Sequence, residues 1–369
     1  MDKFKVLLVL FLSTCHAALS ITDGLLPNGD FEESPKAGHL LNGTVVIFDT
    51  AIPDWTISGI VEYISSPQKQ FNDKLIELQG AHSIKLITGS SIKQKVELTK
   101  GLLYSITLSA AHTCGREDRV KLSLDPSSDE NELDMFFVSG DTSGDGWESF
   151  AQGFRANHTE GEIEISNFGK SDDDDPDCGV LIDSVALKVI NPPKRTRGNL
   201  LKNGNFEEGP YISPNTSWGV DITPLGFDAH IPIPGWLIEN INNVKYIDSD
   251  HFAIPEGKRA VELLAFGSNI ALKQVVITEI GKDYELTFDV GDGKDACKGS
   301  MVVEVFAGKD SVQVPYQSEG KGGFIRGKLR FKAVSTRTNI RITSKQNLTK
   351  KDDRTICGPV IDDVKLLPS

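Results

Sequence analysis

Four cationic side chains near the end of the chain have the spacing of one face of a β-strand. Arg326, Lys328, Arg330 and Lys332 alternate with small or apolar residues through 325–333. Successive side chains of a strand point to opposite faces, so the four cations share one face and the alternate residues turn to a core. The row would be about 20 Å long and could bind an anionic polymer or an acidic partner surface. The alternative is a solvated face whose cations discourage edge pairing.

Residue patterns typical of enzymes are absent from the sequence. It contains no G-x-S-x-G nucleophile elbow, no H-E-x-x-H metal motif and no phosphate-binding glycine-rich loop. A carboxylate pair of the glycosidase type is not excluded, because only folding brings such pairs together. We therefore expect a non-catalytic protein, with a glycan-active enzyme as the least favoured alternative.

The sequence contains an internal repeat, so the elements that position these residues occur in two copies. LLPNGDFEE at 25–33 returns as LLKNGNFEE at 200–208, and IPDW at 52–55 returns as IPGW at 233–236. CGVLIDSV at 178–185 returns as CGPVIDDV at 357–364. Repeats of this length are domains rather than solenoid units. We predict a signal peptide at 1–20, a first domain at 21–190 (copy one), a polar linker at 191–199 and a second domain at 200–369 (copy two).

The cysteines follow the same duplication. Each copy holds one cysteine at mid-domain and one before its last strand. Pairing Cys114 with Cys178 and Cys297 with Cys357 keeps the two copies equivalent, so we predict one disulfide in each. Each would close a loop of about 60 residues, which stabilises by roughly 4 kcal/mol in the chain-entropy model. Metal ligation would need closely spaced cysteines or histidine partners, which the sequence lacks.

The hydrophobic pattern has the period of half-buried strands. Apolar and polar residues alternate through 92–98, 104–109 and 284–290, and no long window shows a helical stripe. Short strands interrupted by Gly, Pro and Asn indicate an all-β protein with a β-sandwich in each copy.

The tryptophans divide into repeated and unrepeated ones. Trp55 and Trp236 recur after Ile-Pro, which favours a core position over stacking on a sugar ring. Trp147 is predicted to lie on the inner face of a strand. Trp218 has no counterpart in copy one, so we expect an exposed ring and a candidate glycan contact.

Several of these motifs resemble a known family. DGLLPNGDFE, IPDW, VEYI, CGVLIDSVA and YIDSDHFAIPEGKRAVEL are similar to a plant cell-wall family catalogued as domain of unknown function 642. The resemblance extends over essentially the whole mature chain. It implies two tandem galactose-binding-like jelly-roll sandwiches, secretion to the wall, association with wall polysaccharide and an influence on pectin methylesterases.

Sandwiches of the galactose-binding type often hold a calcium ion between their first and last strands. The acids shared by both copies at these places are Glu32 with Asp183 and Glu207 with Asp362. Carboxylate oxygens are preferred calcium ligands, which makes these two pairs candidate sites for structural calcium; no cofactor is expected to be required. The alternative is that these acids cap turns or are solvated.

Other features indicate secretion. Residues 1–20 have a weakly positive start, an apolar run and a small-residue cleavage site. No other segment is apolar and long enough to span a bilayer. Four N-x-[ST] sequons predict a glycoprotein; they lie at Asn42, Asn157, Asn215 and Asn347.

Charge separates the two copies. The chain has a net charge of −13, which makes nucleic acid a poor partner. Residues 21–191 hold 13 Lys and Arg against 29 Asp and Glu, whereas residues 192–369 hold 24 against 22. Copy two is therefore the one suited to an anionic polymer. We expect a secreted wall protein that binds pectin or cellulose and modulates enzymes such as pectin methylesterase. The alternative is an extracellular protein-binding module without glycan binding.

Overall fold

The computed structural model is all-β, as the alternating pattern predicts. It describes residues 23–65, 68–71, 74–114, 118–126, 135–138, 146–169, 178–196, 198–222, 231–239, 244–265, 270–344, 348–350 and 355–369. Within these ranges the sole helix is one 3-10 turn, η1 (Ala37–His39). No helix in the described ranges has the length and hydrophobicity needed to cross a bilayer. The predicted signal peptide lies outside the described residues.

The described residues of copy one form fifteen strands. Their bounds are β1 (Asp23–Leu25), β2 (Leu40–Leu41), β3 (Val45–Val46), β4 (Thr56–Ser58), β5 (Val61–Ile64), β6 (Gln68–Phe71), β7 (Lys74–Glu77), β8 (Ser83–Ile87), β9 (Ser91–Glu97), β10 (Leu103–His112), β11 (Asp118–Asp125), β12 (Met135–Val138), β13 (Trp147–Arg155), β14 (Glu160–Asn167) and β15 (Gly179–Ile190).

Copy two contains the remaining strands of the described chain. Their bounds are β16 (Val220–Ile222), β17 (Leu237–Glu239), β18 (Val244–Asp248), β19 (Arg259–Leu263), β20 (Ile270–Ile277), β21 (Asp283–Gly291), β22 (Lys298–Ala307), β23 (Asp310–Glu319), β24 (Phe324–Lys332), β25 (Arg337–Ser344), β26 (Leu348–Thr349), β27 (Ile356–Cys357) and β28 (Val360–Pro368).

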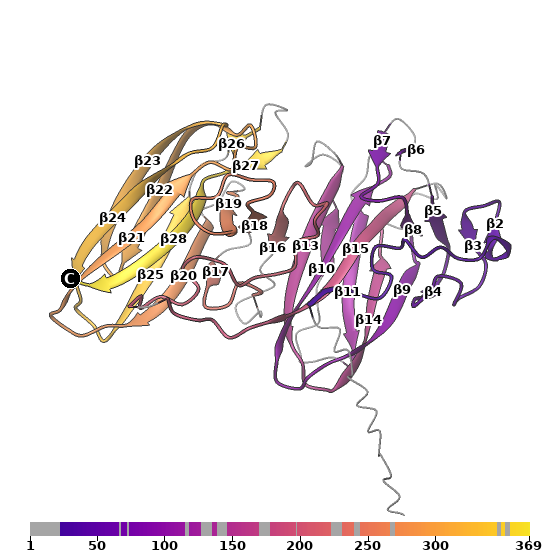
Figure 1. Ribbon diagram of the computed structural model, residues 1–369, viewed down its shortest axis with the longest axis horizontal. Coiled ribbons are helices and arrows are strands. Elements are labelled where there is room, and N and C mark those ends of the chain that lie inside the picture. Colours follow the sequence, from indigo (N-terminus) through magenta and orange to yellow (C-terminus); the bar gives the residue numbers. More distant parts are fainter. Residues whose placement is uncertain are drawn as a thin grey trace, which may run out of the picture.

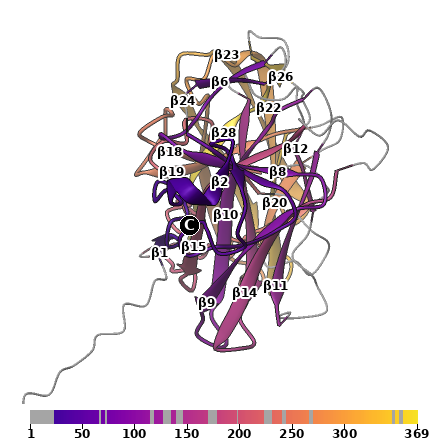
Figure 2. The same cartoon turned by 90° about the vertical axis from the view of Figure 1, so that its right-hand side faces the viewer.

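The two copies repeat one strand order. In copy one the order β5-β8-β15-β10-β13 faces a five-stranded sheet, β4-β9-β14-β11-β12. In copy two β18-β19-β28-β21-β24 faces β17-β20-β25-β22-β23. Figure 1 shows the two sandwiches side by side, and Figure 2 looks along the row with copy one in front. The predicted fold of two tandem jelly-roll sandwiches is confirmed.

A short parallel strand joins the two sandwiches. β16 pairs with β13 of copy one on one side and with β18 of copy two on the other. The layers β5-β8-β15-β10-β13 and β18-β19-β28-β21-β24 therefore belong to one continuous 14-stranded sheet (Figure 1). We call these two layers, and their solvent-side faces, the front layers and front faces of the two copies. The open end of this sheet in copy two is β24.

The repeated Asn-Gly motif forms a tight turn that packs against the last strand of each sandwich. Asn28 and Asn203 both have a left-handed backbone, with φ of 48° in each. A Cβ on Gly29 would lie 2.2 Å from the carbonyl oxygen of Val185, so only glycine fits beside the last strand. The motif recurs because each copy needs the same close approach between its first turn and its last strand.

Each copy is also held by the predicted disulfide. Cys114 pairs with Cys178 and Cys297 with Cys357, at Cα–Cα distances of 5.6 and 5.9 Å. The pairing deduced from the repeat is therefore confirmed, and each bridge ties a mid-domain segment to the start of the last strand.

Candidate functional site

The four cations of β24 lie on the exposed face of the long sheet, as their spacing predicts. β24 pairs with β21 along its whole length. The cationic side chains are all at least half exposed; they belong to Arg326, Lys328, Arg330 and Lys332. The apolar residues between them, Leu329 and Phe331, are buried in the core of copy two. We name these four cations the β24 ladder.

The first cation of the β24 ladder is held by two buried acids. The guanidinium of Arg326 donates two hydrogen bonds to Asp289, at 2.8 and 2.7 Å, and one to Asp363 at 2.7 Å. Both carboxylates are almost fully buried. Arg326 therefore neutralises two acids of the fold as well as facing solvent.

The other cations of the β24 ladder also have acidic partners. Glu285 accepts from Lys328 at 2.9 Å and from Arg330 at 2.7 Å. These hydrogen bonds hold the pKa of Glu285 below its ordinary value. Lys332 lies 3.6 Å from Asp283. The face thus presents alternating charges rather than a row of free cations, and its role in binding pectin stays a prediction.

The acids of β21 that pair with the β24 ladder were not predicted from the sequence, although the alternating pattern of β21 contains them. Asp283, Glu285 and Asp289 occupy the polar positions of the alternating segment 283–290. Only strand pairing reveals that this polar phase lies directly beside the cations. Opposite charges on neighbouring strands stabilise a sheet and compensate each other.

The equivalent face of copy one is covered. Small side chains replace the charged ones, and all of them are buried; they are Ser105, Thr107, Ser109, Ser149 and Ala151. The cover is the segment 209–222 of copy two, which ends in β16 and pairs with β13. Small residues permit this because they let the crossing backbone approach the sheet.

Hydrogen bonds fix the segment 209–222 on copy one. Lys188 donates to the carbonyl of Gly209 at 2.8 Å, and Asn215 donates to the carbonyl of Gln79 at 2.7 Å. This front face of copy one is therefore an internal interface between the two sandwiches.

Trp218 is part of that interface, which corrects the prediction of an exposed ring. Its indole nitrogen donates to the hydroxyl of Ser149 at 2.9 Å. The ring is partly buried against the apolar cluster that contains Trp147 and Leu181. The segment that carries Trp218 contacts both copies, because its residues Ile212, Val220 and Ile222 belong to the core of copy two.

The other tryptophans lie in two different places. Trp55 and Trp236 are buried in the two sandwich cores, where each indole donates to the carbonyl of Asn28 or Asn203 at 2.9 or 2.8 Å. Trp147 lies on the outer face of β13, in the covered cluster rather than the sandwich core. Its predicted inner position is wrong because the outer face is also buried here.

The predicted calcium ligands of copy one have contacts of their own. Glu32 caps the turn before β8: its carboxylate accepts from the backbone of Ala81 and His82 and from the His82 ring, at 2.7 to 3.1 Å. Burial raises the pKa of Glu32, but the hydrogen bond from His82 and those from the backbone lower it overall. Asp183 is buried; one carboxylate oxygen accepts from Ser184 and the other, Oδ2, has no hydrogen-bond partner among the described residues.

Copy two repeats these contacts with one difference. Glu207 caps the equivalent turn at Lys258 and Arg259, at 2.7 and 3.2 Å. Asp362 accepts from the backbone of Asp363 and of Glu256, so both of its oxygens are used. The two aspartates therefore differ in one unpaired oxygen, and no group of three or more potential metal ligands occurs among the described residues of either copy.

Calcium at these acids stays a prediction. If the ion binds, the chain melts several degrees lower in EGTA than in calcium, because a ligand of the folded state stabilises it. Asp183→Asn then removes most of the difference. An identical melting temperature in both buffers contradicts the prediction.

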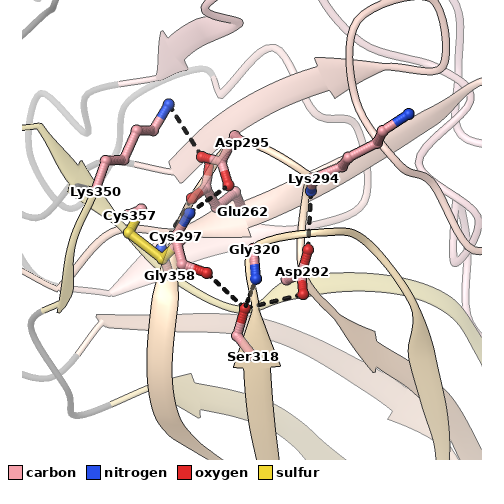
Figure 3. The surroundings of a disulfide bond; sticks show 10 residues. All are labelled: Glu262, Asp292, Lys294, Asp295, Cys297, Ser318, Gly320, Lys350, Cys357 and Gly358. Carbon is pink, nitrogen blue, oxygen red and sulfur yellow. Dashed lines mark hydrogen bonds and ion pairs between the residues drawn. A yellow bond between two sulfur atoms is a disulfide. The ribbon is translucent and has the colours of Figure 1, made fainter. Parts of the chain in front are cut away.

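Charged groups also surround the disulfide of copy two (Figure 3). Lys350 lies 3.0 Å from Asp295, and the hydroxyl of Ser318 donates to Asp292 at 2.9 Å. Glu262 is buried and accepts from the backbone of Gly358 at 2.8 Å. Burial and the nearby charge of Asp295 raise the pKa of Glu262 to about 7.

The sequons occupy different environments. Asn42 is exposed at the turn between β2 and β3, and Asn157 is half buried. Asn215 takes part in the interface with copy one, and Asn347 lies outside the described residues. Glycosylation of these sites stays a prediction.

The fold and these surfaces define a tandem β-sandwich protein of the galactose-binding-like jelly-roll class, with one disulfide in each copy. The family model described as "Protein of unknown function (DUF642)" matches residues 24–188 and 199–367. The chain belongs to the DUF642 family, and the resemblance seen in its motifs is confirmed.

Relatives in Arabidopsis thaliana are similar over nearly their full length. The protein DUF642 L-galactono-1,4-lactone-responsive gene 2 is 46% identical over 363 residues, covering 97% of this chain and 96% of the relative. The protein TEEBE is 39% identical over 363 residues, covering 96% of each.

Solved structures similar in part include carbohydrate-binding modules. The tandem CBM22-1-CBM22-2 domain of Paenibacillus barcinonensis Xyn10C has a TM-score of 0.30 at 12% identity, covering 96% of this chain and 99% of that chain. TmCBM61, solved with β-1,4-galactotriose, has a TM-score of 0.29 at 21% identity, covering 46% and 99%.

Proposed function

We propose that this chain is a secreted, non-catalytic plant cell-wall glycoprotein that binds wall polysaccharide, pectin or cellulose, and modulates wall enzymes such as pectin methylesterase. The observation that carries the proposal is the β24 ladder with its acids: a charged, exposed sheet face in copy two whose counterpart in copy one is covered by the chain itself. The resemblance of the motifs to a plant cell-wall family supports the wall and the enzyme partner, and the predicted signal peptide at 1–20 supports secretion.

The face suits a hydroxyl-rich polymer because it offers donors and acceptors in alternation. Lys328 and Arg330 are at least half exposed on either side of Glu285, and each keeps hydrogen-bonding capacity beyond its bond to that acid. Since these charges compensate each other, binding depends less steeply on salt than a row of free cations would require.

The test compares the full-length chain with a charge-matched pair of variants. Lys328→Gln, Arg330→Gln and Glu285→Gln together remove the centre of the face but leave Arg326, which neutralises two buried acids. The control removes two cations and one acid from exposed positions on β22, β23 and the turn between them, in the other sheet of copy two: Lys298→Gln, Lys309→Gln and Glu319→Gln.

Retention on polygalacturonate, methylated pectin and cellulose is measured for each protein. We expect the face variant to lose at least tenfold in affinity for the polymer that the wild type binds, and the control to retain it. Equal loss in both variants, or none in either, contradicts binding by this face.

The effect on the enzyme needs a separate assay. We expect the wild type to change the rate of pectin demethylation by a pectin methylesterase. Turnover of pectin or glucans by this chain alone would contradict its non-catalytic role. A changed demethylation rate without any retention on polysaccharide would instead identify a protein-binding module.

A further inference from the structure

The dipeptide Asn-Gly occurs three times in the chain, in two different environments. Its asparagines are Asn28, Asn42 and Asn203. Asn28 and Asn203 are equivalent residues in the first turns of the two copies, whereas Asn42 lies in the turn between β2 and β3. An asparagine loses its side-chain amide most easily before glycine, because glycine has no Cβ that hinders attack by its own backbone nitrogen.

The amides of the two sandwich turns are buried and hydrogen-bonded. Nδ2 of Asn28 donates to the carbonyls of Glu33 and Pro53, at 3.1 and 3.0 Å, and Oδ1 accepts from the backbone of Glu33 at 2.9 Å. Asn203 bonds to the backbone of Glu208 in the same way, at 2.8 and 3.1 Å. The two asparagines are 9% and 4% exposed. Neither amide can turn toward the following backbone nitrogen without breaking these bonds.

The glycines that follow them are fixed as well. The backbone N–H of Gly29 donates to Leu26 at 2.8 Å, and its carbonyl accepts from Val185 of the last strand at 2.8 Å. The carbonyl of Gly204 accepts from Val364 of its own last strand at 2.8 Å. Both Asn-Gly pairs are therefore held between a buried side chain and a strand of the sandwich.

Asn42 has none of these restraints. It is exposed, and its side-chain amide makes no hydrogen bond to another described residue. Gly43 is exposed too, and a Cβ built on it would meet no atom within 4 Å. Both have a left-handed backbone, with φ of 53° and 80°, which is the sign that a tight hairpin turn requires. One hydrogen bond closes the turn, from the N–H of Thr44 to the carbonyl of Leu41 at 3.2 Å.

The hairpin that carries this turn is weakly attached to the rest of the sheet. β2 and β3 are two residues long, and β2 is one end of the 14-stranded sheet. β3 pairs with β5 at a single position, Val45 with Glu62. Edge segments with few backbone hydrogen bonds open locally at a small part of the free energy of global unfolding. Such an opening is enough to bring the side-chain carbonyl carbon of Asn42 to the nitrogen of Gly43.

We propose that Asn42 deamidates spontaneously in every molecule in which it carries no glycan, and that the Asn-Gly pairs of the two sandwich turns are protected. The backbone nitrogen of Gly43 attacks Cγ of Asn42, and the new C–N bond closes a five-membered succinimide ring. Nδ2 takes up the proton of that N–H and leaves as ammonia. Water then opens the ring at either carbonyl, which gives aspartate or isoaspartate.

The reaction competes with glycosylation for one nitrogen atom. A glycan at the predicted sequon would be attached to the Nδ2 atom that deamidation removes. Isoaspartate also adds a methylene to the backbone of the turn, next to Thr44, whose carbonyl accepts from the N–H of Tyr63 at 2.8 Å. Deamidation therefore loosens the hairpin of β2 and β3 and adds a negative charge to copy one. The inference is independent of the proposed polysaccharide binding.

The test uses the full-length chain with Thr44→Val, which removes the sequon but keeps the Asn-Gly pair and a β-branched neighbour. The folded protein is incubated near neutral pH, and peptide mapping by mass spectrometry follows the three asparagines. We expect Asn42 to lose its amide at least tenfold faster than Asn28 and Asn203. In guanidinium chloride with a reductant, we expect the three rates to become similar, because all three turns are then unfolded.

Two further samples serve as controls. Gly43→Ala in the Thr44→Val chain should slow the loss at Asn42 at least tenfold, because the added Cβ hinders the attack even though alanine is strained at this φ. Wild-type protein made in a bacterial periplasm, which attaches no N-glycan, should react at Asn42 as the Thr44→Val chain does.

Each other outcome overturns the inference. If Asn42 keeps its amide, or loses it equally fast in the Gly43→Ala chain, it is not a deamidation site of this kind. Equal rates at the three asparagines of the folded protein would show that burial does not protect the sandwich turns. If Asn42 stays tenfold faster in denaturant, its neighbours in sequence set the rate and the fold does not.

Discussion

At the scale of residues, both copies have an acid and a base on neighbouring strands at the same position, but the strand that carries the acid in one copy carries the base in the other. In copy one Lys85 lies 2.9 Å from Glu62 on the neighbouring strand, and both side chains are largely buried. In copy two Glu262 is the cross-strand partner of Lys245, so acid and base have exchanged places. The fold therefore requires that the two buried charges at this position neutralise each other, but not that a given strand carries the positive one.

This symmetry predicts that the copy-one pair can be reversed. Lys85→Glu alone leaves two acids side by side and should cost about 3–5 kcal/mol of unfolding free energy. Adding Glu62→Lys should recover all but about 1 kcal/mol, because copy two already uses that arrangement. Urea unfolding of the wild type, both single variants and the double variant gives the coupling. A double variant no more stable than the worse single variant contradicts the prediction.

Buried acids also set the pH dependence of stability. Burial raises the pKa of Asp362 to about 8, and that of Glu262 is raised to about 7. The unfolded chain releases these protons near pH 4, whereas the folded chain keeps them up to pH 7–8. The folded state therefore binds more protons within this window, and the free energy of unfolding falls as pH rises through it.

We accordingly expect a higher melting temperature at pH 5 than at pH 8, measured in EGTA. Asp362→Asn combined with Glu262→Gln should reduce the slope, because neither replacement titrates, and Asp183, whose pKa burial also raises, accounts for part of what remains. Acids whose pKa is lowered in the folded state, such as Glu285, take up protons only below pH 4.5. They therefore do not change the stability between pH 5 and pH 8. A melting temperature that rises from pH 5 to 8 in the wild type would refute the assignment.

At the scale of elements, the two sandwiches fill the same core position from opposite strands. In copy one Leu108 of β10 faces Phe150 of β13. In copy two Phe288 of β21 faces Gly327 of β24. A Cβ on Gly327 would lie 2.3 Å from the Phe288 ring, so glycine makes room for the aromatic ring of its neighbour. Each strand pair thus carries one aromatic ring at this level of the core, on β13 in copy one and on β21 in copy two.

We therefore predict that the aromatic ring of copy two can be moved from β21 to β24, its place in copy one being the equivalent strand β13. Gly327→Phe alone overpacks the core and should cost about 1–3 kcal/mol or more. Phe288→Leu in the same chain should restore most of that loss, because the pair then matches copy one. Thermal unfolding of the single and double variants measures this, and additive losses would show that the two residues do not share one space.

At the scale of the whole molecule, one sheet runs through both domains. β16 pairs with β13 and β18, and the segment before it covers the front face of copy one. The small residues Ser149 and Ala151 of that face are buried, whereas the cations at the equivalent positions of copy two are exposed. The arrangement makes the protein one extended body instead of two tethered modules.

Bulk on the covered face should separate the copies. Ala151→Arg introduces a long cation where Lys328 stands in copy two, so it should displace the segment 209–222. We expect faster hydrogen exchange in that segment and a larger radius of gyration in small-angle scattering. Lys328→Ala, on the exposed face, is the control and should change neither. Unchanged exchange and size in Ala151→Arg would contradict a packed interface.

Much of the fold could be predicted from local pattern alone. Alternation of apolar and polar residues identified strands, because a strand turns successive side chains to opposite faces. The repeat paired the cysteines, since equivalent domains require equivalent bridges. The same alternation placed Arg326, Lys328 and Arg330 on one face, as the structure has them.

What covers each face was decided only by tertiary structure. The alternation of β13 and β24 is the same, yet Ser149 is buried and Arg326 is exposed, because a segment some sixty residues further along the chain crosses one face and nothing in the described chain crosses the other. Trp218 is packed against copy one for that reason. Periodicity records which side chains share a face, whereas exposure and charge compensation depend on contacts between distant segments, and these exist only once the chain has folded.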